Sequence, residues 1–177
     1  MKRSFGKFAL IILVVAAGLF ADYFSKMWAA NNLKNKPPAA VIKGFVDVGF
    51  VENRGMVFGI FNRGGRPHAV VSAVSWVRLA VCIAVSIYIG MHLQSSILLL
   101  LPFLFIWMGA IGNLIDSFTQ GYVIDFIHIH AGRLLEWPFF FNLADAYVCI
   151  GAATLIFIGL FGPKEQATAP PADQGAA

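Results

Sequence analysis

Long stretches without a charged residue constrain this chain more than any other feature. Phe8 to Ala21 is the first, and Ala146 to Pro163 is the last. Between them, Leu79 to Ile115 is long enough for two helices around a polar break at residues 92–96. A membrane-spanning helix needs about 20 mostly apolar residues. The sequence therefore predicts a mainly α membrane protein with both termini on one side and four spans, at about residues 8–26, 69–91, 95–115 and 145–162.

The composition excludes a soluble protein of this size. The chain has 177 residues, of which 59% are hydrophobic and 12% charged. An average soluble domain is about 45–50% apolar and about 25% charged. About a third of the unfolded chain's surface stays exposed after folding at this length, and so few charges could not keep that surface polar. We expect one integral membrane domain over residues 1–163 and a disordered tail over residues 164–177.

The charge balance and the cysteines point to lipid rather than to nucleic acid or a disulfide framework. The formal net charge is +4, but the basic residues are scattered at the predicted membrane edges. Lipid head groups are therefore the expected partner, and nucleic acid is not. Cys82 and Cys149 both lie inside apolar runs and form no C-x-x-C motif. We interpret both as small core or lipid-facing residues, and we expect a monomer.

Two longer connections carry the polar residues. The first, about residues 29–68, lies between spans one and two and contains a segment rich in Val, Ile and Phe at residues 39–61, which predicts strands rather than a helix. The second, residues 113–142, joins spans three and four and falls on the same membrane face. The Lys and Arg count would place that face in the cytoplasm, whereas the basic N-terminus indicates the opposite orientation. The N-terminal stretch also has the pattern of a cleaved signal peptide, although the rest of the chain favours a first span.

Three aspartates lie near the predicted membrane edge, where ionisable groups are functional candidates. Asp116 ends the third span, Asp145 begins the fourth, and Asp125 lies between them in an apolar segment. If the chain folds back between these spans, Asp125 and Asp145 can meet. Two such carboxylates do not ionise together easily, so one keeps a proton while the other activates water, as in aspartic proteases. Each Asp could instead cap a helix or pair with a cation, but their grouping with Asn113 and Asn142 favours catalysis.

Other polar residues have simpler interpretations. Asp22 and Lys26 lie four residues apart, so they share a helix face and form an interfacial salt bridge. Residues 53–55 read as a turn, from which Arg54 could reach a phosphate.

His128 and His130 form a D-x-x-H-x-H pattern with Asp125 that a metal ion could use. The spacing matches no strong zinc signature, so we predict no metal site and no other cofactor.

Four stretches taken together resemble the lipoprotein signal peptidase family, also called signal peptidase II, a family of bacterial membrane aspartyl peptidases. The order and spacing of the stretches match the family over about residues 8–162, and the set is specific although each member is weak. The stretches are Asp22-Tyr-Phe-Ser-Lys26, then Asn53-Arg-Gly-Met-Val-Phe58, then Gly112-Asn-Leu-Ile-Asp116 leading to Gly121-Tyr-Val-Ile-Asp-Phe126, and finally Asn142-Leu-Ala-Asp145.

The resemblance implies a four-helix bundle in the bacterial inner membrane, with cytoplasmic termini and an extracytoplasmic sheet near the active site. The implied substrates are prolipoproteins that carry a diacylglyceryl-Cys, cut just before that Cys without a metal or organic cofactor. Asp125 and Asp145 would be the catalytic pair that holds a water, and Asn113 and Asn142 would orient it. The residues that would shape or support the site are Asp22, Lys26, Asn53, Gly55, Gly112 and Asp116.

Three departures mark a divergent member of the family. Ser117 stands where the family usually has Arg, so a cation is absent unless Arg54 or Arg133 replaces it. Met56-Val57 replaces two small residues, and the segment over residues 137–142 is one residue longer than usual. These departures leave open an altered substrate preference or a homologue that binds lipopeptide or lipid without cutting. A small proton-coupled carrier is the weakest alternative.

Overall fold

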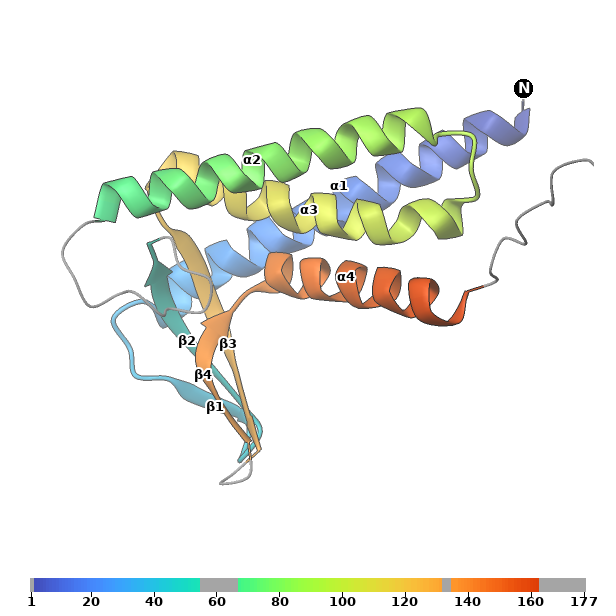
Figure 1. Cartoon of the computed structure of the whole chain (residues 1–177). Helices are drawn as coiled ribbons and strands as arrows, with labels where there is room; N and C mark the ends of the chain where they lie inside the picture. Colours follow the sequence, from blue (N-terminus) through green and yellow to red (C-terminus); the bar gives the residue numbers. More distant parts are fainter. Residues whose placement is uncertain (1, 55–66, 132–134, 163–177) are drawn as a thin grey trace, which may run out of the picture.

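The computed structural model describes residues 2–54, 67–131 and 135–162, and its dominant feature is a set of four long helices (Figure 1). All four are long and apolar enough to cross a membrane, which confirms the predicted span count. In chain order they are α1 (Lys2–Leu33), α2 (Pro67–Met91), α3 (Ile97–Gln120) and α4 (Leu143–Phe161).

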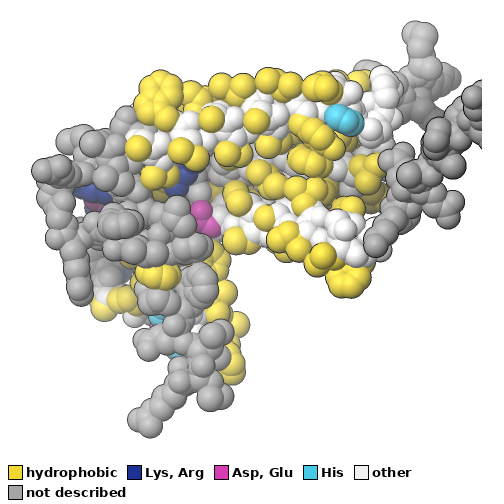
Figure 2. Space-filling view, in the orientation of Figure 1, with side chains coloured by type: hydrophobic (Ala, Val, Ile, Leu, Met, Phe, Trp, Pro, Cys, Tyr) yellow, Lys and Arg dark blue, Asp and Glu magenta, His cyan; other side chains and the backbone are white. Residues whose placement is uncertain are grey.

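Helix α3 is the centre of the bundle. Half of its most apolar window is buried, compared with 6–11% of the corresponding windows in the other helices. The other three helices pack on α3 and expose large hydrophobic side chains on their outer faces. Figure 2 shows hydrophobic side chains over most of the visible bundle surface, while the visible acidic and basic side chains gather toward the sheet. This surface is the one that a lipid bilayer would cover.

Helix α3 also extends further than the sequence predicted. It ends at Gln120, where Gly121 adopts a left-handed conformation (φ +74°) and donates its N–H to the Ser117 carbonyl at 3.2 Å. The prediction ended this span near Ile115, so it placed Asp116 at the end of a helix. Asp116 instead lies inside α3, where the helix positions it beside Gly112 and Asn113.

A four-stranded antiparallel sheet continues from the bundle, with strand order β1-β2-β3-β4. The strands are β1 (Ala39–Ile42), β2 (Val46–Asn53), β3 (Val123–Ala131) and β4 (Leu135–Phe141). The first two confirm the predicted sheet between spans one and two. The other two come from the connection between α3 and α4, for which the sequence analysis predicted no strand. Together they place Asp125 opposite Val51 on the neighbouring strand.

The sheet shares a hydrophobic core with the first helix, since Ala29 and Leu33 of α1 pack against Ile124 and Phe126 of β3. The sheet lies at the opposite end of the bundle from the start of α1 and the end of α4 (Figure 1). At the end of the bundle away from the sheet, Lys7 donates hydrogen bonds to the carbonyls of Leu93 and Ser95. These residues lie in the polar break that was predicted to be the turn between the second and third spans. Helix α1 is thus an integral part of the fold, which argues against a removable signal peptide.

The two cysteines are free, as the sequence predicted. Cys82 is buried in a small core with Ala110 and Leu114, and Cys149 is exposed on α4.

Candidate active site

A buried lysine organises the base of the site. Lys26 is only 2% exposed, and its Nζ lies 2.7 Å from Asp22 Oδ2 and 3.0 Å from Asp116 Oδ2. The same Nζ donates to Asn113 Oδ1 at 3.1 Å. The predicted Asp22–Lys26 pair is therefore present, but it belongs to a larger network that joins α1 to α3. A buried charge needs partners of this kind, because an unpaired one would cost several kcal/mol.

The network also fixes the start of α4 and the start of β3. Asp22 Oδ1 accepts a hydrogen bond from the backbone N–H of Ala144 at 3.0 Å. Asp116 Oδ2 accepts one from the backbone N–H of Ile124 at 3.3 Å. Ala144 directly precedes Asp145 in the chain, and Ile124 directly precedes Asp125. The supporting carboxylates thus act on the backbone that carries the two candidate catalytic residues.

Gly112 is required where α3 approaches this network most closely. A Cβ atom at this position would lie 2.5 Å from Asp22 Oδ2 and 3.3 Å from the Ala144 side chain. We expect Gly112→Ala to destabilise the protein by about 1–3 kcal/mol through overpacking and to lower its unfolding temperature in detergent. Gly90→Ala is the control, since a Cβ there meets nothing within 4 Å. Equal unfolding temperatures for the two variants would contradict this role of Gly112.

Asn142 joins the two candidate catalytic aspartates. This residue is fully buried and caps the N-terminus of α4. Its Nδ2 donates to Asp125 Oδ1 at 2.7 Å, and its backbone N–H donates to Asp145 Oδ2 at 3.2 Å. Its own Oδ1 accepts from the Asp145 N–H at 3.0 Å, which completes a capping box. One residue therefore sets the positions of both carboxyl groups.

Two further asparagines complete the shell around this pair. Asn53 of β2 donates from Nδ2 to Asp125 Oδ2 at 2.9 Å, and Asn113 of α3 donates from Nδ2 to Asp145 Oδ1 at 2.8 Å. Asn113 also accepts from Asn142 Nδ2 at 3.1 Å, so the asparagines are linked to one another. The structure thus brings the predicted residues Asn53, Asn113 and Asn142 together around the predicted aspartates.

Asp125 holds its proton unusually well. The carboxyl group is 2% exposed, and its burial raises its pKa from 3.8 to about 7. The neighbouring Asp145 charge raises this pKa further, against the hydrogen bonds from Asn53 and Asn142, which lower it. A carboxyl group that is about half protonated at pH 7 beside a second carboxyl group has the properties of the acid in an acid–base pair.

A cavity of about 270 Å³ opens in front of the pair. It has a small polar floor and mostly apolar walls, which is the usual composition of a ligand pocket. Residues of α2, α3 and α4 line the cavity. Helix α3 lies between the other two (Figure 1). The polar lining residues are Asn53, Arg78, Asn113, Asp125 and Asp145, and the apolar ones are Val77, Val81, Ile106, Gly109, Ala110, Val123, Phe140, Phe141, Val148 and Cys149.

Arg78 is the functional candidate that the sequence analysis missed. It lies on α2, lines the cavity, and donates from Nη1 to Ser117 Oγ at 3.1 Å. Its guanidinium interacts electrostatically with Asp145, Asp125 and Asp116. The position beside Ser117 is where the sequence analysis noted a missing cation, and a cation from another helix lies there. The sequence did contain a sign of this role, because Arg78 is a charged residue within a predicted span. The spacing of residues 78 and 117 in the sequence, however, does not predict that their side chains meet.

Arg54 lies elsewhere. Its exposed side chain forms an ion pair with Glu52 at 2.9 Å, and this hydrogen bond holds the pKa of Glu52 below its ordinary value. Arg54 is also absent from the described residues that line the cavity. The other proposed replacement, Arg133, lies outside the described residues, as do Gly55, Met56 and Val57.

The fold and site define a polytopic membrane protein with a shielded pair of carboxyl groups at one end of a helix bundle. The family model described as "Signal peptidase (SPase) II" matches residues 14–161. A lipoprotein signal peptidase of Clostridium acetobutylicum is 37% identical over 155 residues, which cover 87% of this chain and 96% of that protein. Another, of Oleidesulfovibrio alaskensis, is 36% identical and covers 82% of this chain and 91% of that protein. The chain belongs to the signal peptidase II family.

Solved structures agree on the fold. One, described as a bacterial membrane enzyme determined by the in meso method, superposes with a TM-score of 0.73 at 22% identity. The superposition covers 92% of this chain and 94% of the other. A second structure with the same description has a TM-score of 0.69 and 21% identity, over 88% and 95% of the two chains.

Proposed function

We propose that this protein is an aspartyl endopeptidase that removes the signal peptide from diacylglyceryl-modified prolipoproteins by cutting before the lipidated Cys. The observation that carries this proposal is the Asp125–Asp145 pair, which Asn142 connects at 2.7 and 3.2 Å. The relatives of this chain are named lipoprotein signal peptidases, which supports the same substrate class.

The two aspartates divide the acid and base roles. Asp125 keeps the shared proton, because burial and the neighbouring charge raise its pKa to about 7. Asp145 then serves as the base that removes a proton from the attacking water. The water oxygen bonds to the scissile carbonyl carbon, and the Asp125 proton passes to the substrate as the peptide bond breaks. This chemistry uses only the chain's own carboxyl groups and one water.

The apolar walls of the cavity suit an amphiphilic substrate. Val77 and Val81 of α2 and Val148 of α4 line the cavity, and both helices expose apolar side chains outward. Lipid chains attached to the substrate Cys can therefore stay in the bilayer while the peptide bond reaches the carboxyl pair.

The same proposal includes an orientation. We place the sheet and the carboxyl pair near the extracytoplasmic face of the bacterial inner membrane and both termini in the cytoplasm. The family resemblance implies this placement, and the cations Lys2, Arg3 and Lys7 at the start of α1 favour it, whereas the Lys and Arg count over the connections on the sheet side favours the reverse.

We assign Arg78 the role of the family's usual cation. Its guanidinium lies in the cavity wall beside both aspartates and is oriented by Ser117. A planar group with several N–H donors can hold a substrate carbonyl and stabilise the negative charge that develops on it.

A cleavage assay tests the function directly. The purified protein in detergent or lipid receives a prolipoprotein with or without the diacylglyceryl group, and gel shift and mass spectrometry follow the products. We expect cleavage of the lipidated form only, with the new N-terminus at the lipidated Cys. Tight lipid-dependent binding without product, in a tube where another family member does cut, would favour the non-cleaving homologue instead.

The protonation of Asp125 predicts a pH dependence. The acid form is populated below about pH 7 and is lost above it, so kcat/KM should fall on the alkaline side with an apparent pKa of about 7. A rate that keeps rising above pH 8 would contradict this assignment.

The Asp125 carboxyl group also makes the stability of the fold depend on pH. The pKa of Asp125 in the folded protein, about 7, lies above its ordinary value of 3.8, so its contribution to stability is present below about pH 4 and is lost as the pH rises to about 7. In Asp125→Asn this component of the pH dependence of unfolding should be absent.

A further inference from the structure

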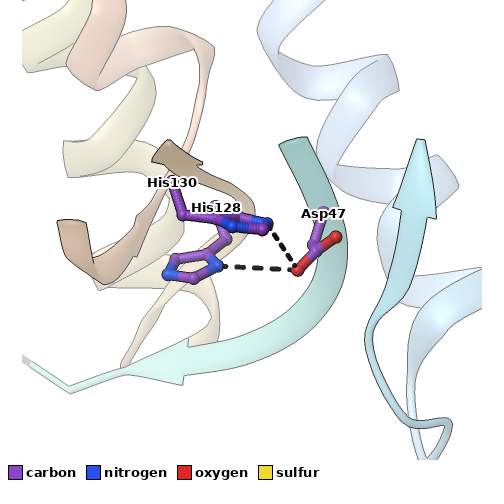
Figure 3. A group of neighbouring side chains, drawn as sticks. All are labelled: Asp47, His128 and His130. Atoms are coloured by element: carbon purple, nitrogen blue, oxygen red, sulfur yellow. Dashed lines mark ion pairs between the residues drawn. The ribbon is translucent and has the colours of Figure 1, made fainter. Parts of the chain in front are cut away.

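A second cluster of chemically active side chains lies on the sheet, separate from the carboxyl pair. Asp47 of β2 and His128 and His130 of β3 bring three potential metal-ligand atoms within 4.8 Å of one another (Figure 3). One carboxylate oxygen, Asp47 Oδ2, lies 3.1 Å from His130 Nε2 and 3.9 Å from His128 Nδ1. These residues are not part of the proposed peptidase chemistry.

The strand register creates this cluster. Asp47 lies directly opposite His128 in the β2–β3 pair. Residues two apart on a strand point to the same face, so His130 follows His128 on that face. The backbone N–H of His130 donates to the Phe45 carbonyl at 2.8 Å, which holds this part of β3 against β2. The sequence pattern grouped the histidines with Asp125, but that residue is three positions from His128 and points to the other face.

Aromatic packing holds the imidazole rings in place. The His128 and His130 rings are stacked with centroids 5.4 Å apart, and His128 also stacks on Phe140 of β4 at 5.0 Å. Ligands that are already oriented lose little conformational entropy when they bind an ion. The three side chains remain 18–27% exposed, although the Nε2 atom of His130 is itself buried, so an ion would enter from the side of Asp47 and His128.

The contact between His130 and Asp47 fits a bridging ion better than a hydrogen bond. Although Nε2 of His130 lies 3.1 Å from Asp47 Oδ2, this buried nitrogen makes no hydrogen bond to the described residues, since the two groups are not in line. A metal ion needs no such alignment, because its bonds to two ligands meet at an angle. Tetrahedral bonds of about 2.0–2.1 Å place ligand atoms roughly 3.3 Å apart. The two separations to Asp47 Oδ2, 3.1 and 3.9 Å, lie on either side of this value, and all three ligand atoms lie within 4.8 Å of one another.

The surroundings leave the Asp47 charge available for a cation. Within residues 2–54, 67–131 and 135–162, this carboxylate forms ion pairs with the two histidines and with no lysine or arginine. Imidazole nitrogens and a carboxylate are the ligand set that Zn²⁺ and related transition ions prefer. We propose that Asp47, His128 and His130 form a binding site for a divalent transition-metal ion such as Zn²⁺, with water completing the coordination.

The site would act on the sheet rather than on the peptide bond. It joins β2 to β3, and the same two strands carry Asn53 and Asp125 at their other ends. A bound ion therefore strengthens the strand pair that positions half of the catalytic shell. Since an ion that binds only the folded state stabilises it, the unfolding temperature should rise with the metal concentration.

The experiment is a titration of the intact protein, in detergent and without a histidine tag, with ZnCl₂ followed by calorimetry. We expect one ion per chain and at least a tenfold weaker dissociation constant in each of His128→Ala, His130→Ala and Asp47→Asn. His92→Ala is the matched control, because His92 lies in the turn after α2, whose end is at the end of the bundle away from the sheet (Figure 1), and should not change binding. Mg²⁺, which prefers oxygen ligands, should not bind at the concentrations that saturate the site with Zn²⁺.

Two further readouts protect the test against misfolded variants. The metal-free variants should unfold within a few degrees of the wild type, and Zn²⁺ should raise the unfolding temperature only of the wild type and of His92→Ala. Co²⁺ added to the wild type should give the visible absorption of a bound ion. Absence of saturable Zn²⁺ binding to the wild type, or unchanged binding in His130→Ala, overturns the proposal. Equal binding of Mg²⁺ overturns it too.

Discussion

Asp125→Asn and Asp145→Asn should each reduce cleavage of a lipidated prolipoprotein by at least about a thousandfold, which is the loss expected when a group essential to the chemical step is removed. Each substitution keeps the size of the side chain but removes either the transferable proton or the base. The loss should appear in kcat, while lipopeptide binding should remain near the wild-type level. Gel-shift cleavage combined with a binding assay on the same preparations measures both quantities.

Asp116→Asn is the matched control for this pair. Asp116 is also buried, but it contacts Lys26 and the backbone of Ile124, and it is not among the described residues lining the cavity. We expect this variant to lose stability, because Lys26 keeps only part of its charge compensation, while the remaining folded protein still cuts. Full turnover by Asp125→Asn or Asp145→Asn would remove that residue from the catalytic pair.

Local properties of the sequence predicted the helices and marked Asp125 and Asp145 as candidates, whereas the pairing of the two carboxyl groups rested on the assumed fold-back of the chain and on the family resemblance. A charge-free stretch of sufficient length has few alternatives to a spanning helix. Asp125 stood out because a carboxylate in an apolar segment requires an explanation, and its pKa of about 7 shows how strongly burial affects it. The Asp22–Lys26 pair was likewise predictable from its spacing of four residues on one helix.

The remaining features depend on tertiary contacts. Strands β3 and β4 were missed because the segment between α3 and α4 was judged by its polar residues, whereas pairing with β2 determines its structure. The same pairing brings Asp47 next to His128, although 81 positions separate these residues in the sequence. The contact between Arg78 and Ser117 requires a particular rotation of α2 against α3, which no sequence pattern in a single chain specifies.

Arg78→Ala should reduce kcat/KM on the order of 10- to 100-fold, a loss typical of one charged hydrogen-bond donor at a reacting group. The guanidinium is the cation that the described part of the cavity wall provides, and it lies beside both aspartates. Ser117→Ala should have a much smaller effect, since it removes the hydrogen bond that orients the guanidinium and leaves the charge in place. Steady-state cleavage of the lipidated substrate, measured for each variant, checks both values.

The double variant Arg78→Ala/Ser117→Arg separates a functional charge from a structural contact. It moves the cation from α2 to the neighbouring position on α3, where the family usually has it. Its kcat/KM should be at least tenfold higher than that of Arg78→Ala. Ser117→Arg alone should impair the enzyme, because a second guanidinium would lie against Arg78 and like charges repel at this distance. If Arg78→Ala cuts at the wild-type rate, or if the double variant is no better than Arg78→Ala, then Arg78 does not replace the family's arginine. Recovery of activity in the double variant would show that the reaction requires a positive charge at this position. It would also show that either helix can supply that charge.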